Sequence, residues 1–257
     1  MTKRQAVIPK HVVEKLVLAA GPRLVLVGGQ ALAFWMDRFG ITMPGGFEYV
    51  SKDIDFLAES AADSEAVRRL ATALGGRSVF PRRRAALTAL VGQAILDVSE
   101  EEVFNVDVLH KMWGADDSVR SRAVLAGDVR DGYRVLHPLD LLKSRLDNLY
   151  GLKEKQNDLG KAQLHAGIEV AQAFQRQAAA TERRPKDKRP TTLRYVGFIE
   201  HLATGDAGKK VASRHRIHVA DAIEPEAVPS RIFHDKKLPQ LARLMSDARR
   251  RALGLTP

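Results

Sequence analysis

Two acidic residues, Asp53 and Asp55, have the spacing of a metal-binding pair. They alternate with the apolar residues Ile54 and Phe56. On a β-strand, residues two apart point to the same face, so the two carboxylates would stand side by side. Adjacent carboxylates repel each other, and a divalent cation removes that repulsion. Oxygen ligands suit Mg²⁺, which also binds nucleotide phosphates. Taken alone, the pair fits two solvated surface acids equally well.

A third acid, Asp107, interrupts the apolar segment Val103–Leu109. A charge among β-branched residues needs a partner or a metal ion. If this segment forms a strand beside the one that carries Asp53 and Asp55, the three carboxylates can hold two Mg²⁺ ions. Paired metals of this kind lie roughly 3.5–4 Å apart and support in-line phosphoryl transfer. The three acids together therefore predict a catalytic metal site.

Two adjacent glycines, Gly28 and Gly29, follow the apolar segment Leu24–Val27 and precede a helix expected over Gln30–Phe39. Glycine permits positive φ and lets a backbone approach a ligand closely. The unpaired N–H groups at a helix start attract phosphate. The pair therefore indicates a phosphate cradle, although a lone Gly-Gly pair also occurs in ordinary turns.

These segments are expected to lie in a mixed α/β (α+β) protein, with a small mixed sheet flanked by helices and a mostly helical region after it. Apolar periodicity predicts helices and strands. Helices are expected at 7–20, 30–39, 64–74, 139–152, 157–177, 195–203 and 237–253. Strands are expected at 24–27, 50–57, 87–90, 94–98, 103–109, 124–125 and 133–136. We predict a catalytic domain at 1–136 and a basic helical domain at 137–257, with an exposed segment near 181–192.

Composition limits the function classes. The chain has no cysteine among 257 residues, which excludes disulfides, thiolate metal sites and cysteine nucleophiles. No apolar run is long enough to span a membrane, and we expect a cytoplasmic protein. The formal charge is +10, and residues 176–257 hold 18 Lys/Arg against 9 Asp/Glu. Such asymmetry favours a nucleic-acid partner; a solvated basic tail is the alternative.

The order of strand, glycine pair, helix, Asp-x-Asp strand and later acidic strand resembles the nucleotidyltransferase superfamily, which has the DNA polymerase β-like fold. Gly28–Leu32 and Ser51–Asp55 are most similar to the opening motifs of AbiEii-type toxins of abortive-infection and toxin–antitoxin systems. Leu136–Leu146 resembles their later motif, in which a proline-initiated helix brings a basic residue to the phosphates. The resemblance covers roughly residues 20–170 and leaves the C-terminal third unexplained.

The resemblance implies a nucleotidyltransferase that uses two Mg²⁺ ions and an NTP as substrate, ATP among the candidates. Asp53, Asp55 and Asp107 would be the catalytic metal ligands. The nucleotide-binding residues would be Gly28, Gly29, Ser51, Lys143, Arg145 and Lys155. The acceptor would be RNA such as tRNA, and a cognate antitoxin would be a protein partner. For Arg145 and Lys155, a solvated helix face is the competing interpretation.

Two other functions stay open. The chain could be a non-catalytic nucleotide- or RNA-binding module of the same fold. It could also be a small-molecule nucleotidyltransferase that modifies an antibiotic, although the basic C-terminal region would then be unexplained. Neither a P-loop motif nor a Gly-x-Ser-x-Gly motif occurs in the sequence. Trp35 and Trp113 are expected in the core, His137 at a helix start, and Arg214–His218 exposed or facing phosphate.

Overall fold

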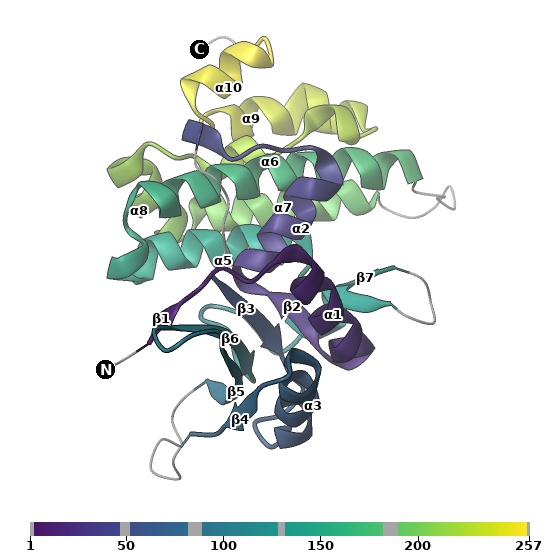
Figure 1. Ribbon diagram of the computed structural model, residues 1–257. Coiled ribbons are helices and arrows are strands. Elements are labelled where there is room, and N and C mark those ends of the chain that lie inside the picture. Colours follow the sequence, from purple (N-terminus) through teal and green to yellow (C-terminus); the bar gives the residue numbers. More distant parts are fainter. Residues whose placement is uncertain (1–2, 47–51, 82–88, 128–131, 182–189, 256–257) are drawn as a thin grey trace. The chain divides into compact units, whose positions relative to one another are not determined.

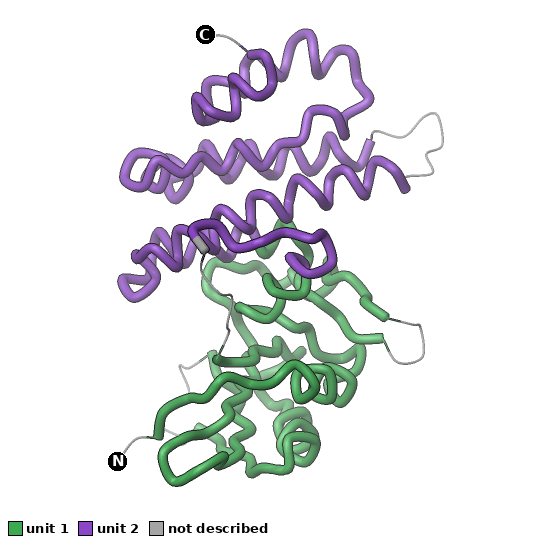
Figure 2. Tube along the Cα trace, turned by 45° about the horizontal axis from the view of Figure 1, so that its top comes forward, with its two compact units in different colours: residues 1–34, 48–141 green, residues 35–47, 142–257 purple. Residues whose placement is uncertain are grey.

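The sheet that carries the acidic segments is mixed, which confirms the predicted fold class. The computed structural model describes residues 3–46, 52–81, 89–127, 132–181 and 190–255. The chain divides into two compact units (Figure 2), residues 1–34 with 48–141 and residues 35–47 with 142–257. The division at 141/142 lies five residues after the boundary expected at 136/137, and the second unit also takes a short segment from the first third.

Unit 1 contains a sheet of eight strands among the described residues (Figure 1). The strands are β1 (Arg4–Gln5), β2 (Val25–Val27), β3 (Asp53–Leu57), β4 (Arg77–Val79), β5 (Leu90–Asp97), β6 (Glu102–Leu109), β7 (Val124–Ala126) and β8 (Tyr133–Val135). Their order is β4-β5-β6-β3-β2-β8-β7, and β1 pairs with β6. β3 runs parallel to β6, whereas β2 lies antiparallel to β3 and β5 lies antiparallel to β6.

One face of this sheet is apolar and covered by helices. Ile54 and Phe56 of β3 and Val106 and Val108 of β6 are buried on it. Helices α1 (Lys10–Ala20) and α3 (Ser64–Leu74) pack on each other, and α3 packs on β5. Alternation along each strand sends the neighbouring residues to the opposite face. The acidic residues of β3 and β6 therefore lie on the face that α3 does not cover.

Helix α3 shows how local sequence determines an element. The Asp63 side chain accepts a hydrogen bond from the Ala66 N–H and caps the N-terminus at 3.1 Å. Gly75 ends the helix with φ +77°, a left-handed conformation that glycine adopts without strain. Val67 and Leu70 lie on the buried side. The predicted bounds of this helix, 64–74, are confirmed.

Two helices begin in unit 1 and end in unit 2. Helix α2 (Gly28–Phe39) follows β2 directly, so Gly28 and Gly29 form its first turn rather than a turn before it. Helix α5 (Pro138–Gly151) follows β8, and His137 precedes it as expected. A short 3₁₀ segment, Pro44–Gly46, follows α2, and α4 (Val119–Arg122) is a single turn between β6 and β7.

Unit 2 is built from helices. They are a 3₁₀ turn at Lys153–Lys155, α6 (Asp158–Thr181), α7 (Thr191–Thr204), α8 (Asp206–His215), 3₁₀ turns at Val219–Ala222 and Pro225–Ala227, a π-helical turn at Phe233–Lys237, α9 (Leu238–Ala242) and α10 (Asp247–Ala252). An aromatic cluster lies within this unit: Trp35 packs edge-on against Phe174 with a centroid distance of 6.1 Å, and Phe174 lies 5.5 Å from Tyr195. Among the described residues, no helix is long and apolar enough to cross a membrane.

Two expectations for the aromatic and C-terminal residues are wrong. Trp35 is buried as expected, but the Trp113 side chain is 64% exposed. The single helix expected over 237–253 is interrupted, because Ser246 takes an extended conformation and its side chain caps α10 by accepting from the Arg249 N–H at 3.2 Å. This cap satisfies N–H groups that a continuous helix would have bonded internally.

Other boundaries differ for local reasons. The first helix starts at Lys10 instead of residue 7, because Pro9 takes an extended conformation at its N-cap. β5 extends unbroken from Leu90 to Asp97 across the expected gap at 91–93. Strand β4 and helix α8 were not expected. Residues 87–88 of one expected strand, residues 50–51 of another, and most of the segment 181–192 lie outside the described residues.

Candidate active site

The three predicted metal ligands lie on one face of the sheet. β3 and β6 pair in parallel, with Asp55 opposite Asp107 and Asp53 opposite Asn105. Neighbouring strands are about 4.8 Å apart, so side chains in register are immediate neighbours. Because the side-chain period is two, Asp53 and Asp55 share this face with Asn105 and Asp107. The pairing of the two acidic strands, which was the condition for the predicted metal site, is present in the structure, and the strand register brings the acids together.

Two amide side chains orient the Asp107 carboxylate. Gln93 Nε2 of β5 and Asn105 Nδ2 each donate a hydrogen bond to Asp107 Oδ1, both at 2.8 Å. Hydrogen bonds to a carboxylate favour its ionised form and hold it in one orientation. Both of these bonds end on Oδ1 of the Asp107 carboxylate.

Asn105 contributes a second feature to the face. Its side chain is only 4% exposed, and its Oδ1 has no hydrogen-bond partner among the described residues. A buried polar atom left without a partner is costly and rare in folded proteins. This oxygen belongs to the residue in register with Asp53. The carboxylate face therefore includes a further oxygen that suits a cation.

Gly28 lies so close to Asp55 that a Cβ at this position would require the carboxylate to move. Gly28 has φ +64°, and a Cβ placed on it would lie 2.0 Å from Asp55 Oδ2. The carboxylate thus lies directly against the first residue of α2. A helix N-terminus carries a partial positive charge and favours nearby anions. The glycine pair and the Asp-x-Asp pair, although far apart in the sequence, form one local structure.

The face fits a divalent cation by its donor set. It combines carboxylates on neighbouring strands with a buried amide oxygen that has no partner in the part of the chain that the structure describes, and these hard oxygen ligands are those that Mg²⁺ takes. Within the described ranges, no three His, Asp or Glu side chains converge into a single metal-binding group. The acids are therefore neighbours on one face and do not form a closed cage.

The predicted basic residues lie in unit 2. Lys143 Nζ pairs with Asp147 Oδ2 of the same helix at 2.6 Å. Arg145 is only 6% exposed and donates from Nη1 to Gln163 Oε1 at 3.2 Å, so the solvated-face interpretation is wrong for this residue. Lys155 is exposed in a 3₁₀ turn. Ser51 lies outside the described residues.

A second polar cluster fixes the loop after β6. Arg122 donates from Nε and Nη2 to the buried Asp140 carboxylate at 2.8 and 2.7 Å. The same guanidinium contacts Asp116 at 3.1 Å. Hydrogen bonds from Arg122, with a smaller contribution from Ser118, lower the pKa of Asp116 to about 2. This bidentate pairing ties residues 116–122 to the first turn of α5.

His137 lies beside this cluster in a neutral state. Burial lowers the pKa of His137 to about 4, and the nearby Asp140 carboxylate only partly opposes that effect. The Leu139 N–H donates to Nδ1 at 3.2 Å, which requires an unprotonated nitrogen there. The residue caps the start of α5.

Sequence reasoning missed Gln93 and Arg122. Asn105 shows a partial signal, because it lies two residues before Asp107 and so shares its face. Gln93 lies on β5, and only the strand register places it opposite Asp107. Arg122 and its partner Asp140 are 18 positions apart and carry no spacing pattern that identifies them.

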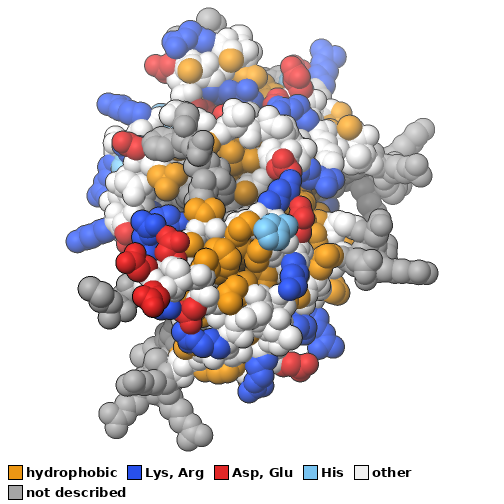
Figure 3. All heavy atoms as spheres, in the orientation of Figure 1, with side chains coloured by type: hydrophobic (Ala, Val, Ile, Leu, Met, Phe, Trp, Pro, Cys, Tyr) orange, Lys and Arg blue, Asp and Glu red, His pale blue; other side chains and the backbone are white. Residues whose placement is uncertain are grey.

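On the face drawn in Figure 3, Lys and Arg side chains are interspersed with Asp and Glu. Part of the segment Arg214–His218 packs into the interior of unit 2. Ile217 is buried, and His218 Nδ1 lies 3.2 Å from the Leu244 carbonyl oxygen. The segment was expected to be exposed or to face phosphate, and Ile217 departs from that expectation because it is buried.

The chain matches no model of a known protein family. No curated protein matches its sequence significantly.

Proposed function

We propose that this chain is a Mg²⁺-dependent nucleotidyltransferase that transfers a nucleoside monophosphate from an NTP to an RNA acceptor. The observation that carries the proposal is the β3–β6 register, which opposes Asp55 to Asp107 and Asp53 to Asn105. Adjacent carboxylates are costly without a cation. The contact between Gly28 and Asp55 supports the proposal, because it joins a helix N-terminus to the same acids.

Each residue has a distinct role in the proposal. Asp53, Asp55 and Asp107 would hold two Mg²⁺ ions, with the Asn105 amide oxygen beside them. Bound Mg²⁺ supplies charge neutralisation for the triphosphate. Gly28 and Gly29 offer the N-terminus of α2 to the phosphates. Lys143, Arg145 and Lys155 remain predicted phosphate ligands.

The reaction joins the acceptor to the α-phosphate. The acceptor hydroxyl oxygen forms a bond to the α-phosphorus, and the bond from this phosphorus to the bridging oxygen breaks. Pyrophosphate leaves with that oxygen, and the hydroxyl proton passes to the Asp107 carboxylate. A carboxylate within hydrogen-bond reach of the acceptor suits this role. Gln93 and Asn105 hold Asp107 in position through Oδ1.

The resemblance to AbiEii-type toxins extends the proposal to a biological setting. The chain would act in the cytoplasm as the toxin of a toxin–antitoxin or phage-defence system, and a cognate antitoxin would bind it. The excess of Lys and Arg in residues 176–257 supports an RNA acceptor.

The test is nucleotide transfer by purified protein. Wild type, Asp53→Asn and Glu101→Gln are incubated with Mg²⁺, each labelled NTP in turn, and total RNA. Glu101 is an exposed acid between β5 and β6 and is the matched control. We expect wild type and Glu101→Gln to produce labelled RNA. Asp53→Asn should produce less labelled RNA by about 100-fold or more.

Two results would contradict the proposal. Transfer to an aminoglycoside but not to RNA would identify a small-molecule nucleotidyltransferase. Nucleotide binding without transfer to any acceptor would identify a binding module. Melting curves of each variant check that loss of transfer does not reflect unfolding.

A further inference from the structure

An exposed tryptophan stands at the tip of the loop that follows β6. Trp113 is 64% exposed, although tryptophan is highly buried on average in folded proteins. The Ala115 N–H donates to the Met112 carbonyl oxygen at 3.3 Å, which closes a tight turn with Trp113 and Gly114 at its centre. Gly114 has φ +71°, as the third position of a type II turn requires. Trp113 therefore lies in a tight turn with most of its surface exposed.

The loop that presents Trp113 is braced at several points. Arg120 donates from Nη1 to the Ala58 carbonyl oxygen beyond β3 at 3.2 Å. The Ser118 N–H donates to Asp116 Oδ1 at 2.9 Å, and Arg122 bonds both Asp116 and the buried Asp140. An aromatic ring on a fixed loop binds a flat ligand with little loss of conformational entropy.

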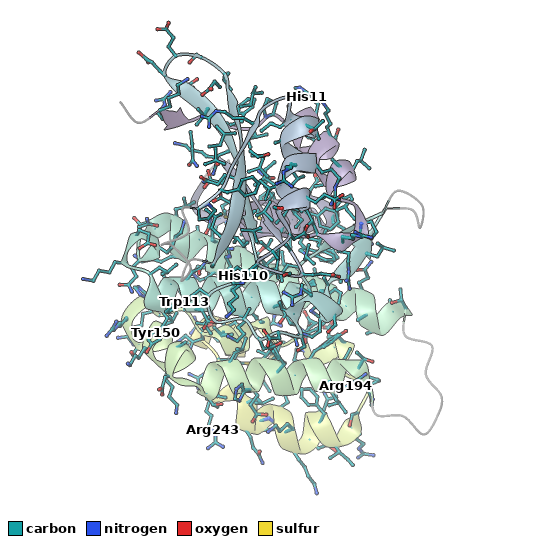
Figure 4. All side chains as sticks on the ribbon, turned by 90° about the horizontal axis from the view of Figure 1, so that it is seen from below. His11, His110, Trp113, Tyr150, Arg194 and Arg243 are labelled. Atoms are coloured by element: carbon teal, nitrogen blue, oxygen red, sulfur yellow. The ribbon has the colours of Figure 1, made fainter. Side chains whose placement is uncertain are left out.

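A pocket of about 200 Å³ lies beside this turn in unit 1. Its wall includes Leu57, His110, Lys111, Asp117 and Arg120. Leu57 is two residues beyond Asp55, and alternation places its side chain on the carboxylate face, about 7 Å further along the strand. Figure 4 shows His110 and Trp113 in the segment that follows β6. The pocket therefore adjoins the candidate active site within one unit.

The chemistry of this wall suits a nucleobase. The volume is below the roughly 300 Å³ at which pockets for whole small molecules begin, so a single ring system fits better than a nucleotide. Lys111 and Arg120 offer donors, whereas the carboxylates of Asp116 and Asp117 offer acceptors. A bare phosphate would be repelled by these two carboxylates, but a base edge presents both donors and acceptors. Unpaired bases of single-stranded RNA are recognised by such contacts together with aromatic stacking.

We infer that this turn and pocket bind the single-stranded end of the RNA acceptor, with one base stacked on Trp113 and a neighbouring base in the pocket. The inference rests on the proposed function, because the RNA end would reach the three acids from this side. In this inference, the loop after β6 recognises the RNA acceptor.

The test measures RNA binding without catalysis. A fluorescein-labelled single-stranded RNA of about ten nucleotides, within the range of site sizes of single-strand binders, is titrated with protein in EDTA and without NTP, and binding is followed by anisotropy. Stacking on an aromatic side chain contributes enough that Trp113→Ala should raise the Kd about 5- to 100-fold. Trp113→Phe keeps a ring and should stay within about threefold of wild type. Leu125→Ala, which truncates an exposed apolar residue of β7 in the same unit, is the control and should bind like wild type.

Tryptophan fluorescence gives a second readout. The chain has two tryptophans, and Trp35 is buried. We expect unlabelled RNA to quench wild-type fluorescence and to leave Trp113→Phe unchanged. Free ATP without Mg²⁺ should quench little. Equal quenching by ATP, or RNA binding by Trp113→Ala within about twofold of wild type, would overturn the inference, because loss of a stacked base costs more than that.

The outcomes separate the two proposals. If the wild type transfers nucleotides but Trp113→Ala binds RNA normally, the proposed function is supported and the stacking site at Trp113 is contradicted. If RNA binding depends on Trp113 but no transfer occurs to any acceptor, the nucleotidyltransferase proposal fails and the loop remains an RNA-binding site.

Discussion

Replacing Asp107 by asparagine tests whether the acidic face is built around a cation. In Asp107→Asn the new amide can present its oxygen to the same two amide donors, so both 2.8 Å hydrogen bonds can be kept. The change removes the repulsion between positions 55 and 107. At a separation of about 6 Å this repulsion is about 0.7 kcal/mol in water and about 2.8 kcal/mol at an effective dielectric constant of about 20. Because both side chains are half-buried, we expect Asp107→Asn to stabilise the metal-free protein by about 1 kcal/mol, or about 2–4 °C in Tm.

Magnesium should reverse the order of stability of wild type and Asp107→Asn. At about ten times its Kd, a ligand that binds only the folded protein stabilises it by about 1.4 kcal/mol. Wild type and the control Glu101→Gln should gain this amount, whereas Asp107→Asn should gain little. Differential scanning calorimetry with EDTA and with a Mg²⁺ series measures both effects. The reasoning is refuted if Asp107→Asn melts below wild type in EDTA, or if Mg²⁺ stabilises it as much as wild type.

Three further changes have expected outcomes. In urea unfolding, Gly28→Ala should lower the free energy of unfolding by more than Gly75→Ala does. Both glycines have positive φ, and that strain alone costs about 1–2 kcal/mol, but only a Cβ at Gly28 would meet a carboxylate. Equal losses in the two variants would contradict the close contact. His137→Gln should remove a pH dependence. Folding lowers the pKa of His137 from 6.5 to about 4, so between these two pH values the unfolded chain binds more protons than the folded one. The free energy of unfolding of wild type should therefore fall by up to about 3 kcal/mol as the pH falls from 6.5 to 4. The same pH dependence in His137→Gln would count against a buried neutral imidazole. Arg122→Ala should lower the free energy of unfolding by about 2 kcal/mol, because it leaves Asp140 buried without its main partner. The double variant Arg122→Ala with Asp140→Leu should recover most of that loss. Chemical denaturation of wild type, the two single variants and the double variant shows whether the two effects are coupled.

The acidic strands could be predicted from the sequence because each has a local pattern. Ile54 and Phe56 alternate with the two acids, and apolar residues surround Asp107, so both segments could be recognised as strands with one polar position per repeat. The pairing of Asp55 with Asp107 was a conditional expectation, since register depends on contacts between segments that are distant in the sequence. Gln93 required the same register and was therefore missed.

Local signals also account for the errors. The apolar spacing over 237–253 favours one helix, but the Ser246 cap competes with it and starts a new helix. Tryptophan is usually buried, and that average predicted the core for Trp113. In the structure Trp113 instead lies in a turn beside Gly114, and it is 64% exposed. Composition alone does not contain that information.

The interleaving of the two units has a consequence for synthesis on the ribosome. Trp35 emerges early, but its aromatic partner Phe174 in the same unit comes 139 positions later (174 − 35). At about 5–20 residues per second, the indole waits roughly 7–28 s before that partner exists. During this interval Trp35, which lies inside α2 (Gly28–Phe39), has no contact with Phe174. The order of translation therefore delays completion of the second unit until its last helices emerge.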